Sequence, residues 1–129
     1  MQRTYESLIE EAKKVSQNAY APYSKFKVGA CVLFESGNIY TGCNVENGSY
    51  GLSLCAERNA LSNAISNGEK SKLTAIAIYS PQKNECAPCG ACRQWIFEFN
   101  ENAKIILAKA DKSLSVLNIQ ELLPYSFKL

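Results

Sequence analysis

The sequence predicts an α/β protein with three layers, in which helices cover both faces of a mixed sheet of about five strands. Three observations support this expectation. Short, almost continuously apolar runs alternate along the chain with segments of helical periodicity. The first two apolar runs are joined by a turn, which predicts an antiparallel hairpin. The later runs are separated by helices, which favours parallel pairing of their strands.

The length and composition predict one soluble domain over residues 1–129. A net charge of +2 with no basic block disfavours nucleic-acid binding. The N-terminal residues carry charge where a signal peptide would be apolar. Since no apolar run approaches the ~18 residues of a membrane helix, we expect no membrane span. In the expected cytoplasmic location the six cysteines would stay reduced.

The first half of the chain predicts a helix followed by a hairpin. Apolar residues recur every three or four positions over residues 4–18, which indicates an amphipathic helix. Residues 27–34 predict a buried strand, and residues 39–46 predict its hairpin partner. Asn44 and Glu46 lie two positions apart near the end of that second strand. Strand alternation therefore places their side chains on one face.

The second half predicts alternating helices and strands. In chain order we expect helix 55–67, strand 73–79, helix 90–100, strand 104–108, strand 114–117 and a short helix before Pro124. Gly68 is expected to end the first of these helices. Asn118 and Glu121 have the spacing of a capping box at the start of the last helix.

Two short segments combine cysteines with charged residues: residues 55–58 (Cys-Ala-Glu-Arg) and 88–92 (Pro-Cys-Gly-Ala-Cys). Both open a predicted helix, where free N–H groups and the helix dipole favour thiolates. The chain contains no histidine, so a transition-metal site must use sulfur and carboxylate. The thiolates of Cys55, Cys89 and Cys92 would leave a fourth tetrahedral position open, as in catalytic zinc sites. Zinc lowers the pKa of a bound water to about 7.

Charged residues beside these cysteines fit such a site. Three thiolates on Zn²⁺ carry a net negative charge, which Arg58 and Arg93 could offset by hydrogen bonding to the sulfurs. Glu57 lies two positions from a ligand and could carry a proton from water to a substrate. A glutamate in a first helical turn also interacts favourably with the helix dipole, which is the alternative explanation for Glu57.

The other cysteines leave an alternative open. Cys86, Cys89 and Cys92 have C-x-x-C-x-x-C spacing, as in part of an iron–sulfur run, but the complete pattern is absent. Cys86 lies in the loop before the helix, so we expect it not to be a ligand. Cys31 and Cys43 are expected to be core residues. A structural zinc module that binds RNA or a protein would instead need a fourth ligand, such as Cys86.

These motifs together resemble the cytidine deaminases, and the resemblance covers nearly the whole chain. The matching segments are residues 26–30 (Phe-Lys-Val-Gly-Ala), 44–47 (Asn-Val-Glu-Asn), 55–58 and 89–94 (Cys-Gly-Ala-Cys-Arg-Gln). The three-cysteine set is similar to that of the small homotetrameric nucleoside deaminases. The resemblance implies a cytidine deaminase-like domain with one zinc ion per subunit on Cys55, Cys89 and Cys92. It also implies that Glu57 is the proton shuttle.

The resemblance further implies a pocket for a pyrimidine nucleoside. The implied substrate-binding residues are Phe26, Asn44, Glu46, Gly48, Tyr50, Ala56 and Phe127. Phe26 would lie against the pyrimidine ring, and Asn44 and Glu46 would bind the sugar hydroxyls. Neighbouring subunits of a homotetramer would supply Tyr50 and Phe127. Taken singly, Phe26 is also compatible with a core position, and Glu46 with a solvated charge.

The implied reaction is hydrolysis of the cyclic amidine C–N bond of cytidine or 2′-deoxycytidine. The products would be uridine or 2′-deoxyuridine and ammonia, in pyrimidine salvage. A cytosine-containing antibiotic or a base within nucleic acid are alternative substrates for the same fold. The pair Asn44 and Glu46 favours a free nucleoside, because a polynucleotide has esterified the hydroxyls that they would bind.

Overall fold

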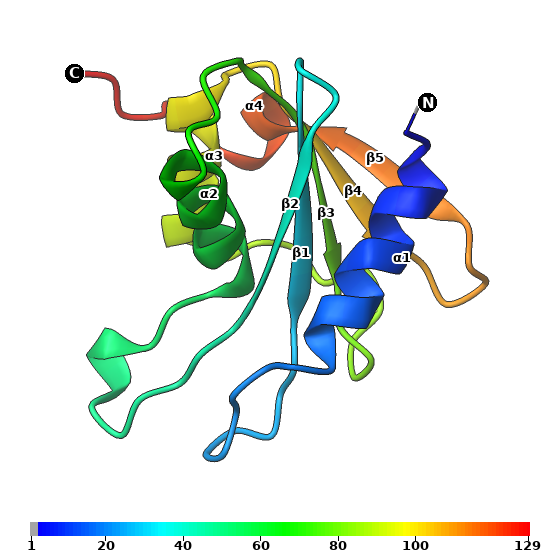
Figure 1. Ribbon diagram of the computed structural model, residues 1–129, viewed down its shortest axis with the longest axis vertical. Helices are drawn as coiled ribbons and strands as arrows, with labels where there is room; N and C mark the ends of the chain where they lie inside the picture. Colours follow the sequence, from blue (N-terminus) through cyan, green and yellow to red (C-terminus); the bar gives the residue numbers. More distant parts are fainter. Residues whose placement is uncertain (1–2) are drawn as a thin grey trace.

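A mixed five-stranded sheet in the order β2-β1-β3-β4-β5 runs through the computed structural model, which describes residues 3–129 (Figure 1). β1 is antiparallel to both β2 and β3, whereas β4 is parallel to β3 and antiparallel to β5. The strands are β1 (Gly29–Phe34), β2 (Ile39–Cys43), β3 (Leu73–Tyr79), β4 (Lys104–Ala108) and β5 (Leu114–Asn118). The predicted mixed α/β sheet is therefore confirmed.

Helices cover both faces of this sheet. α1 (Tyr5–Ser16) packs on one face, and α2 (Ala56–Ser66) and α3 (Gly90–Phe99) lie on the other (Figure 1). The short helix α4 (Ile119–Leu122) joins α3 on that second face, and a 3-10 turn spans Tyr50–Leu52. No helix within residues 3–129 has the length and apolar character needed to cross a membrane.

Side chains cap the first and last helices, and the sequence predicted the cap of the last one. Thr4 Oγ1 accepts a hydrogen bond from Ser7 N at 3.1 Å, and Ser7 Oγ accepts one from Thr4 N at 3.1 Å. At the start of α4, Glu121 accepts from Asn118 N at 3.0 Å. These contacts give hydrogen-bond partners to backbone N–H groups at the start of each helix, where the helix itself supplies none.

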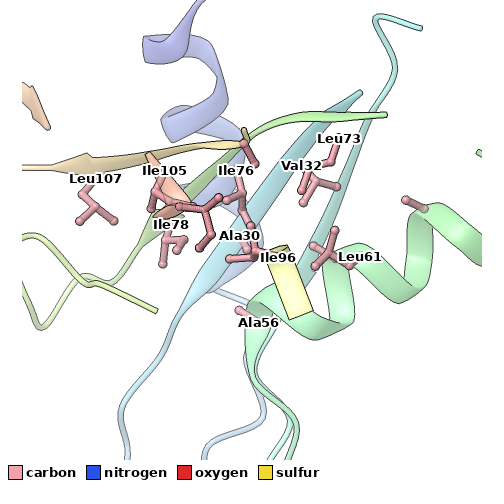
Figure 2. Close-up of a cluster of buried hydrophobic side chains, with 14 of the residues drawn as sticks. Ala30, Val32, Ala56, Leu61, Leu73, Ile76, Ile78, Ile96, Ile105 and Leu107 are labelled. Carbon is pink, nitrogen blue, oxygen red and sulfur yellow. The ribbon is translucent and has the colours of Figure 1, made fainter. Parts of the chain in front are cut away.

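The larger core lies between the sheet and the helices α2 and α3 (Figure 2). Ile76, Ile78 and Ile105 project from β3 and β4, and they meet Leu61 of α2 and Ile96 of α3. All five side chains are fully buried, so this core holds both helices at fixed positions on the sheet.

Two glycines allow helices to approach the strands closely. A Cβ atom at Gly29 would lie 1.9 Å from Ala12 O of α1. A Cβ atom at Gly42 would lie 2.3 Å from Ala60 N of α2, on the other face. Because a methyl group cannot occupy either position, each glycine sets the distance between one helix and the sheet.

Some predicted boundaries are wrong by a few residues. β1 begins at Gly29 and not at residue 27, because Lys27 N and Val28 N donate to side chains. β2 ends at Cys43 and not at residue 46. The strands of each strand–helix–strand unit, β2-α2-β3 and β3-α3-β4, run parallel to each other. Because β1 lies between β2 and β3, only the parallel strands β3 and β4 pair directly.

Candidate metal centre and substrate cavity

The sulfurs of Cys55, Cys89 and Cys92 converge at the N-terminal ends of α2 and α3. All three lie within 4.8 Å of one another, and Cys55 Sγ is 3.9 Å from Cys89 Sγ. Cys55 is the N-cap of α2 and Cys89 is the N-cap of α3, while Cys92 is buried in the first turn of α3. Two helix dipoles therefore place partial positive charge beside the sulfurs.

This cluster fits a zinc ion with one open position. Two sulfurs on one tetrahedral zinc lie about 3.8 Å apart, because each Zn–S bond is ~2.3 Å. The observed separation of 3.9 Å between Cys55 and Cys89 agrees with that geometry. Cys86 is buried but lies outside the sulfur cluster, which removes the obvious fourth ligand of a closed structural site.

Arg58 supports the sulfurs directly. Its Nη2 donates to Cys55 Sγ at 3.5 Å. Its Nε is buried, and among residues 3–129 it has no hydrogen-bond partner. A hydrogen bond from the Cys92 thiol, followed by the one from Arg58, lowers the pKa of Cys55 to about 5. Cys55 is therefore predisposed to be the thiolate that a cation requires.

Arg93 has different partners from those that the sequence suggested. Its Nε donates to Pro88 O at 2.7 Å, and its Nη1 donates to Leu122 O at 3.0 Å. These bonds join the turn before Cys89 to the end of α4. Arg93 thus supports the turn before Cys89 through the backbone of Pro88. Arg58 is the arginine that binds a sulfur of the cluster, that of Cys55.

Glu57 occupies the first turn of α2, two residues after Cys55. The residue is only 5% exposed. Burial, reinforced by the nearby Cys55 charge, raises the pKa of Glu57 to about 7. A carboxyl group with a pKa near neutrality can both accept and release a proton, as general acid–base chemistry requires.

A cavity of about 250 Å³ opens beside this centre. Its wall contains Phe26, Asn44, Glu46, Ala56 and Glu57, together with Cys55 and Cys89 of the sulfur cluster. Four of the seven predicted substrate-binding residues therefore share one cavity with the sulfurs and the buried carboxyl group. Cys86 and Ala87 also line it, and neither was singled out as a pocket residue from the sequence.

Asn44 and Glu46 of this wall also bind backbone groups of the chain. Asn44 Oδ1 accepts from Val28 N, and its Nδ2 donates to Phe26 O, each at 2.8 Å. Glu46 Oε1 accepts from Tyr23 N at 3.0 Å, and its Oε2 accepts from the Ser24 hydroxyl. The Ser24 bond is the main cause of a lowered pKa of Glu46. An amide hydrogen of Asn44 and lone pairs of Glu46 remain for a ligand.

Three predicted substrate-binding residues lie outside this chain's own cavity: Gly48, Tyr50 and Phe127. Gly48 packs beside the hydroxyl of Tyr23, whose ring meets Tyr50 edge-on at 6.0 Å. Tyr50 is 75% exposed and Phe127 is 67% exposed. Their exposure leaves both aromatic rings free to contact another molecule.

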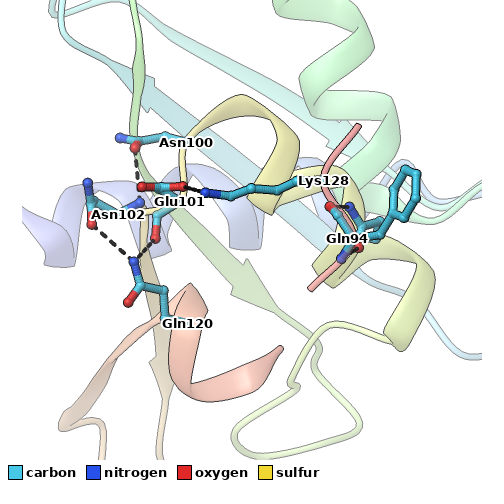
Figure 3. A network of polar contacts seen from close by, with 7 residues as sticks. Gln94, Asn100, Glu101, Asn102, Gln120 and Lys128 are labelled. Carbon is cyan, nitrogen blue, oxygen red and sulfur yellow. Dashed lines mark hydrogen bonds and ion pairs between the residues drawn. The ribbon is translucent and has the colours of Figure 1, made fainter. Parts of the chain in front are cut away.

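The C-terminal segment is held on α3 by polar contacts (Figure 3). Gln94 Nε2 donates to Phe127 O at 3.1 Å, and Phe127 N donates to Gln94 Oε1 at 3.4 Å. Lys128 forms an ion pair with Glu101 at 2.6 Å. The backbone at Phe127 is therefore tied to the same helix that carries Cys92.

Sequence comparison places the chain among deaminases. Residues 2–109 match the family profile of the cytidine and deoxycytidylate deaminase zinc-binding region. A cytidine deaminase of Sporosarcina psychrophila is 44% identical over 123 residues, covering 95% of this chain and 90% of that protein. A probable cytidine deaminase of Dictyostelium discoideum is 42% identical, covering 98% of this chain and 85% of that protein.

Solved structures have the same fold. A cytidine deaminase from Burkholderia pseudomallei superposes with a TM-score of 0.91 at 42% identity, covering 97% of this chain and 100% of that one. A cytidine deaminase from Mycobacterium tuberculosis superposes with a TM-score of 0.85 at 35% identity, covering 99% and 100%. The similarity includes both helices that carry the sulfurs.

Proposed function

Because the chain belongs to the cytidine and deoxycytidylate deaminase family, we propose that it deaminates both cytidine and 2′-deoxycytidine in pyrimidine salvage. A cytidine deaminase is a hydrolase, and its substrate is a pyrimidine nucleoside. The observation that carries the proposal is the single cavity that joins two sulfurs of a three-sulfur cluster to the buried carboxyl group of Glu57.

The proposed cofactor is one zinc ion per subunit, held by Cys55, Cys89 and Cys92. When bound, zinc supplies a Lewis acid that makes water nucleophilic at neutral pH. The protein's contribution is to keep the cysteine sulfurs deprotonated and correctly positioned. Arg58 does this through Cys55, and Arg93 does it through the backbone of the turn before Cys89.

Glu57 is proposed to move the protons of the reaction. It takes a proton from the attacking water and delivers it to ring N3, which makes C4 of the pyrimidine more electrophilic, and the water oxygen bonds to C4. It then takes the remaining proton from that oxygen and gives it to the amine, so that ammonia departs as the C–N bond breaks and a C4 carbonyl is left. The burial that raises the pKa of Glu57 to about 7 supports both roles, since the group can exchange protons near neutral pH.

The remaining residues are proposed to hold the nucleoside. Phe26 packs against the pyrimidine, Ala56 lies beside the base, and Asn44 and Glu46 bind the sugar hydroxyls. The cavity of about 250 Å³ is smaller than the ~300 Å³ at the low end for ligand pockets. The small volume supports completion of the pocket by other subunits.

We propose a homotetramer in which neighbouring subunits contribute Tyr50 and Phe127, with the backbone of Gly48 near the base. The exposure of both aromatic side chains supports this arrangement. Activity per subunit should then fall on dilution together with the assembled fraction, as read by light scattering. Full activity of a monomer would contradict it.

The test of the proposed function is an ultraviolet assay with cytidine, 2′-deoxycytidine, cytosine and CMP, run alongside zinc quantification. Glu57→Gln should keep the fold and the zinc but lower kcat about 10²- to 10⁴-fold, because the proton carrier is lost. Glu10→Gln makes the same change at an exposed site on α1 and should behave as the wild type. Near-normal kcat in Glu57→Gln would refute the proton-shuttle role.

A further inference from the structure

The segment around Phe26 has a defined position although residues 25–28 form neither helix nor strand. Side chains bind its backbone groups instead. Phe26 N donates to Ser24 Oγ at 3.0 Å, and Phe26 O accepts from Asn44 Nδ2 at 2.8 Å. Val28 N donates to Asn44 Oδ1 at 2.8 Å. The half-buried aromatic ring of Phe26 is thus carried by a backbone that side chains hold in place.

Gln82 completes this arrangement from a distant part of the chain. Its Oε1 accepts from Lys27 N at 2.7 Å, across a sequence separation of 55 residues. Its Nε2 donates to Lys25 O. One side-chain amide therefore binds the backbone on both sides of Phe26, and it uses its acceptor and a donor to do so.

Gln82 also belongs to the loop that leads to the metal centre. Residues 80–88 connect β3 to α3, and the next residue is the ligand Cys89. Gln82 N donates at 3.2 Å to the hydroxyl of Ser80, which is buried. Further along, Cys86 and Ala87 line the substrate cavity. The loop therefore contacts the cavity directly and also reaches Phe26 through Gln82.

We propose that Gln82 is a positioning residue that fixes Phe26 against the pyrimidine and holds it in register with the loop that ends at Cys89. The inference rests on the proposed function, in which Phe26 packs against the base. Gln82 itself does not line the cavity. Phe26 would pack against the base equally in the bound ground state and in the transition state. Loss of this support should therefore raise KM and leave kcat nearly unchanged.

The experiment compares three variants of the zinc-loaded full-length protein. Gln82→Ala removes both contacts and should raise the KM for cytidine about tenfold, as expected for lost hydrogen bonds. Gln82→Glu keeps an acceptor for Lys27 N but offers no donor to Lys25 O, so its KM should be intermediate. Lys83→Ala alters an exposed side chain of the same loop and should leave KM unchanged.

Two further measurements separate positioning from a general loss of stability. In a Glu57→Gln background, calorimetry should show the dissociation constant for cytidine rising by the same factor on Gln82→Ala. NMR should show faster hydrogen exchange at the Lys27 amide in Gln82→Ala, because its acceptor is gone.

Each outcome has one meaning. A lower Tm with KM within twofold of the wild type would overturn the inference, as would a loss confined to kcat or unchanged exchange at Lys27. Faster exchange at Lys27 in a protein whose wild type deaminates no cytidine would instead overturn the proposed function.

Discussion

Gly42→Ala should damage the metal centre by displacing α2, the helix that begins after Cys55. The added Cβ would lie 2.3 Å from Ala60 N, 2.8 Å from Asn59 C and 2.9 Å from Ala56 O. These are backbone atoms of α2, so no side-chain rotation relieves the contact. Real Cβ contacts are essentially never shorter than 3.0 Å, so α2 must shift from β2 by at least about 0.7 Å.

This shift matters because α2 begins at Cys55 and carries Glu57 in its first turn. The other two sulfurs lie on α3, which Gly42 does not touch. A displacement approaching 1 Å at a catalytic centre costs up to ~100-fold in rate. We therefore expect kcat/KM to fall about 10- to 100-fold and zinc affinity to decrease, with a loss of roughly 1–3 kcal/mol in the free energy of unfolding.

Gly29→Ala is the matched control. Its Cβ would lie 1.9 Å from Ala12 O, so it displaces a helix as well, but that helix is α1 on the other face of the sheet. The assay measures kcat/KM, bound zinc by mass spectrometry and Tm for both variants. Gly42→Ala should lose activity out of proportion to its Tm, and Gly29→Ala should lose Tm with little change in kcat/KM. Equal activity in the two variants at equal Tm would refute the reasoning.

Three other predictions concern charge and metal. Arg58→Gln should weaken zinc binding about 10- to 100-fold in a chelator competition, because Cys55 loses its cationic partner, and unchanged affinity would contradict this. Glu69 accepts hydrogen bonds from Ser71, Tyr40 and Ser36, and these, the Ser71 hydroxyl first, lower its pKa to about 2. Since the folded pKa lies below the ordinary 4.5, this carboxylate stabilises the fold above pH ~4.5 and loses that effect as the pH falls towards 2. Denaturation of wild type and Glu69→Gln should therefore differ at pH 7 and converge in acid, and a constant difference would count against the argument. Removal of metal by a chelator should lower Tm but leave the far-ultraviolet circular dichroism nearly unchanged, because none of the three proposed ligands, Cys55, Cys89 and Cys92, belongs to the hydrophobic core cluster between the sheet and the helices α2 and α3.

The sequence predicted the parts of the fold that depend on local pattern. The bounds of β3 and β4 are as expected, because each is an apolar run with clear turn residues around it. The convergence of Cys55 with Cys89 and Cys92 also followed, since both segments open helices. Asn44 and Glu46 share the cavity as alternation suggested, although the regular strand ends before them at Cys43.

Contacts between distant segments could not be predicted. Gln82 occupies an unremarkable polar position in a loop, and only the folded chain brings it beside Lys25 and Lys27. Arg93 was expected near the sulfurs because of its place after Cys92, but sequence position does not decide which acceptors its guanidinium meets. Such partners depend on tertiary packing, for which the sequence has no local pattern.

The meeting of two helix N-termini at the sulfur cluster also has an effect on the unfolded chain. Cys55 and Cys89 are 34 positions apart, yet their sulfurs lie 3.9 Å apart. A metal ion that stayed bound to both sulfurs while the rest of the chain unfolded would close a loop of that length. By analogy with a disulfide, such a closure removes chain entropy equivalent to roughly 4 kcal/mol. Part of the heat resistance of the metal-loaded protein would then come from conformations that the unfolded chain can no longer adopt.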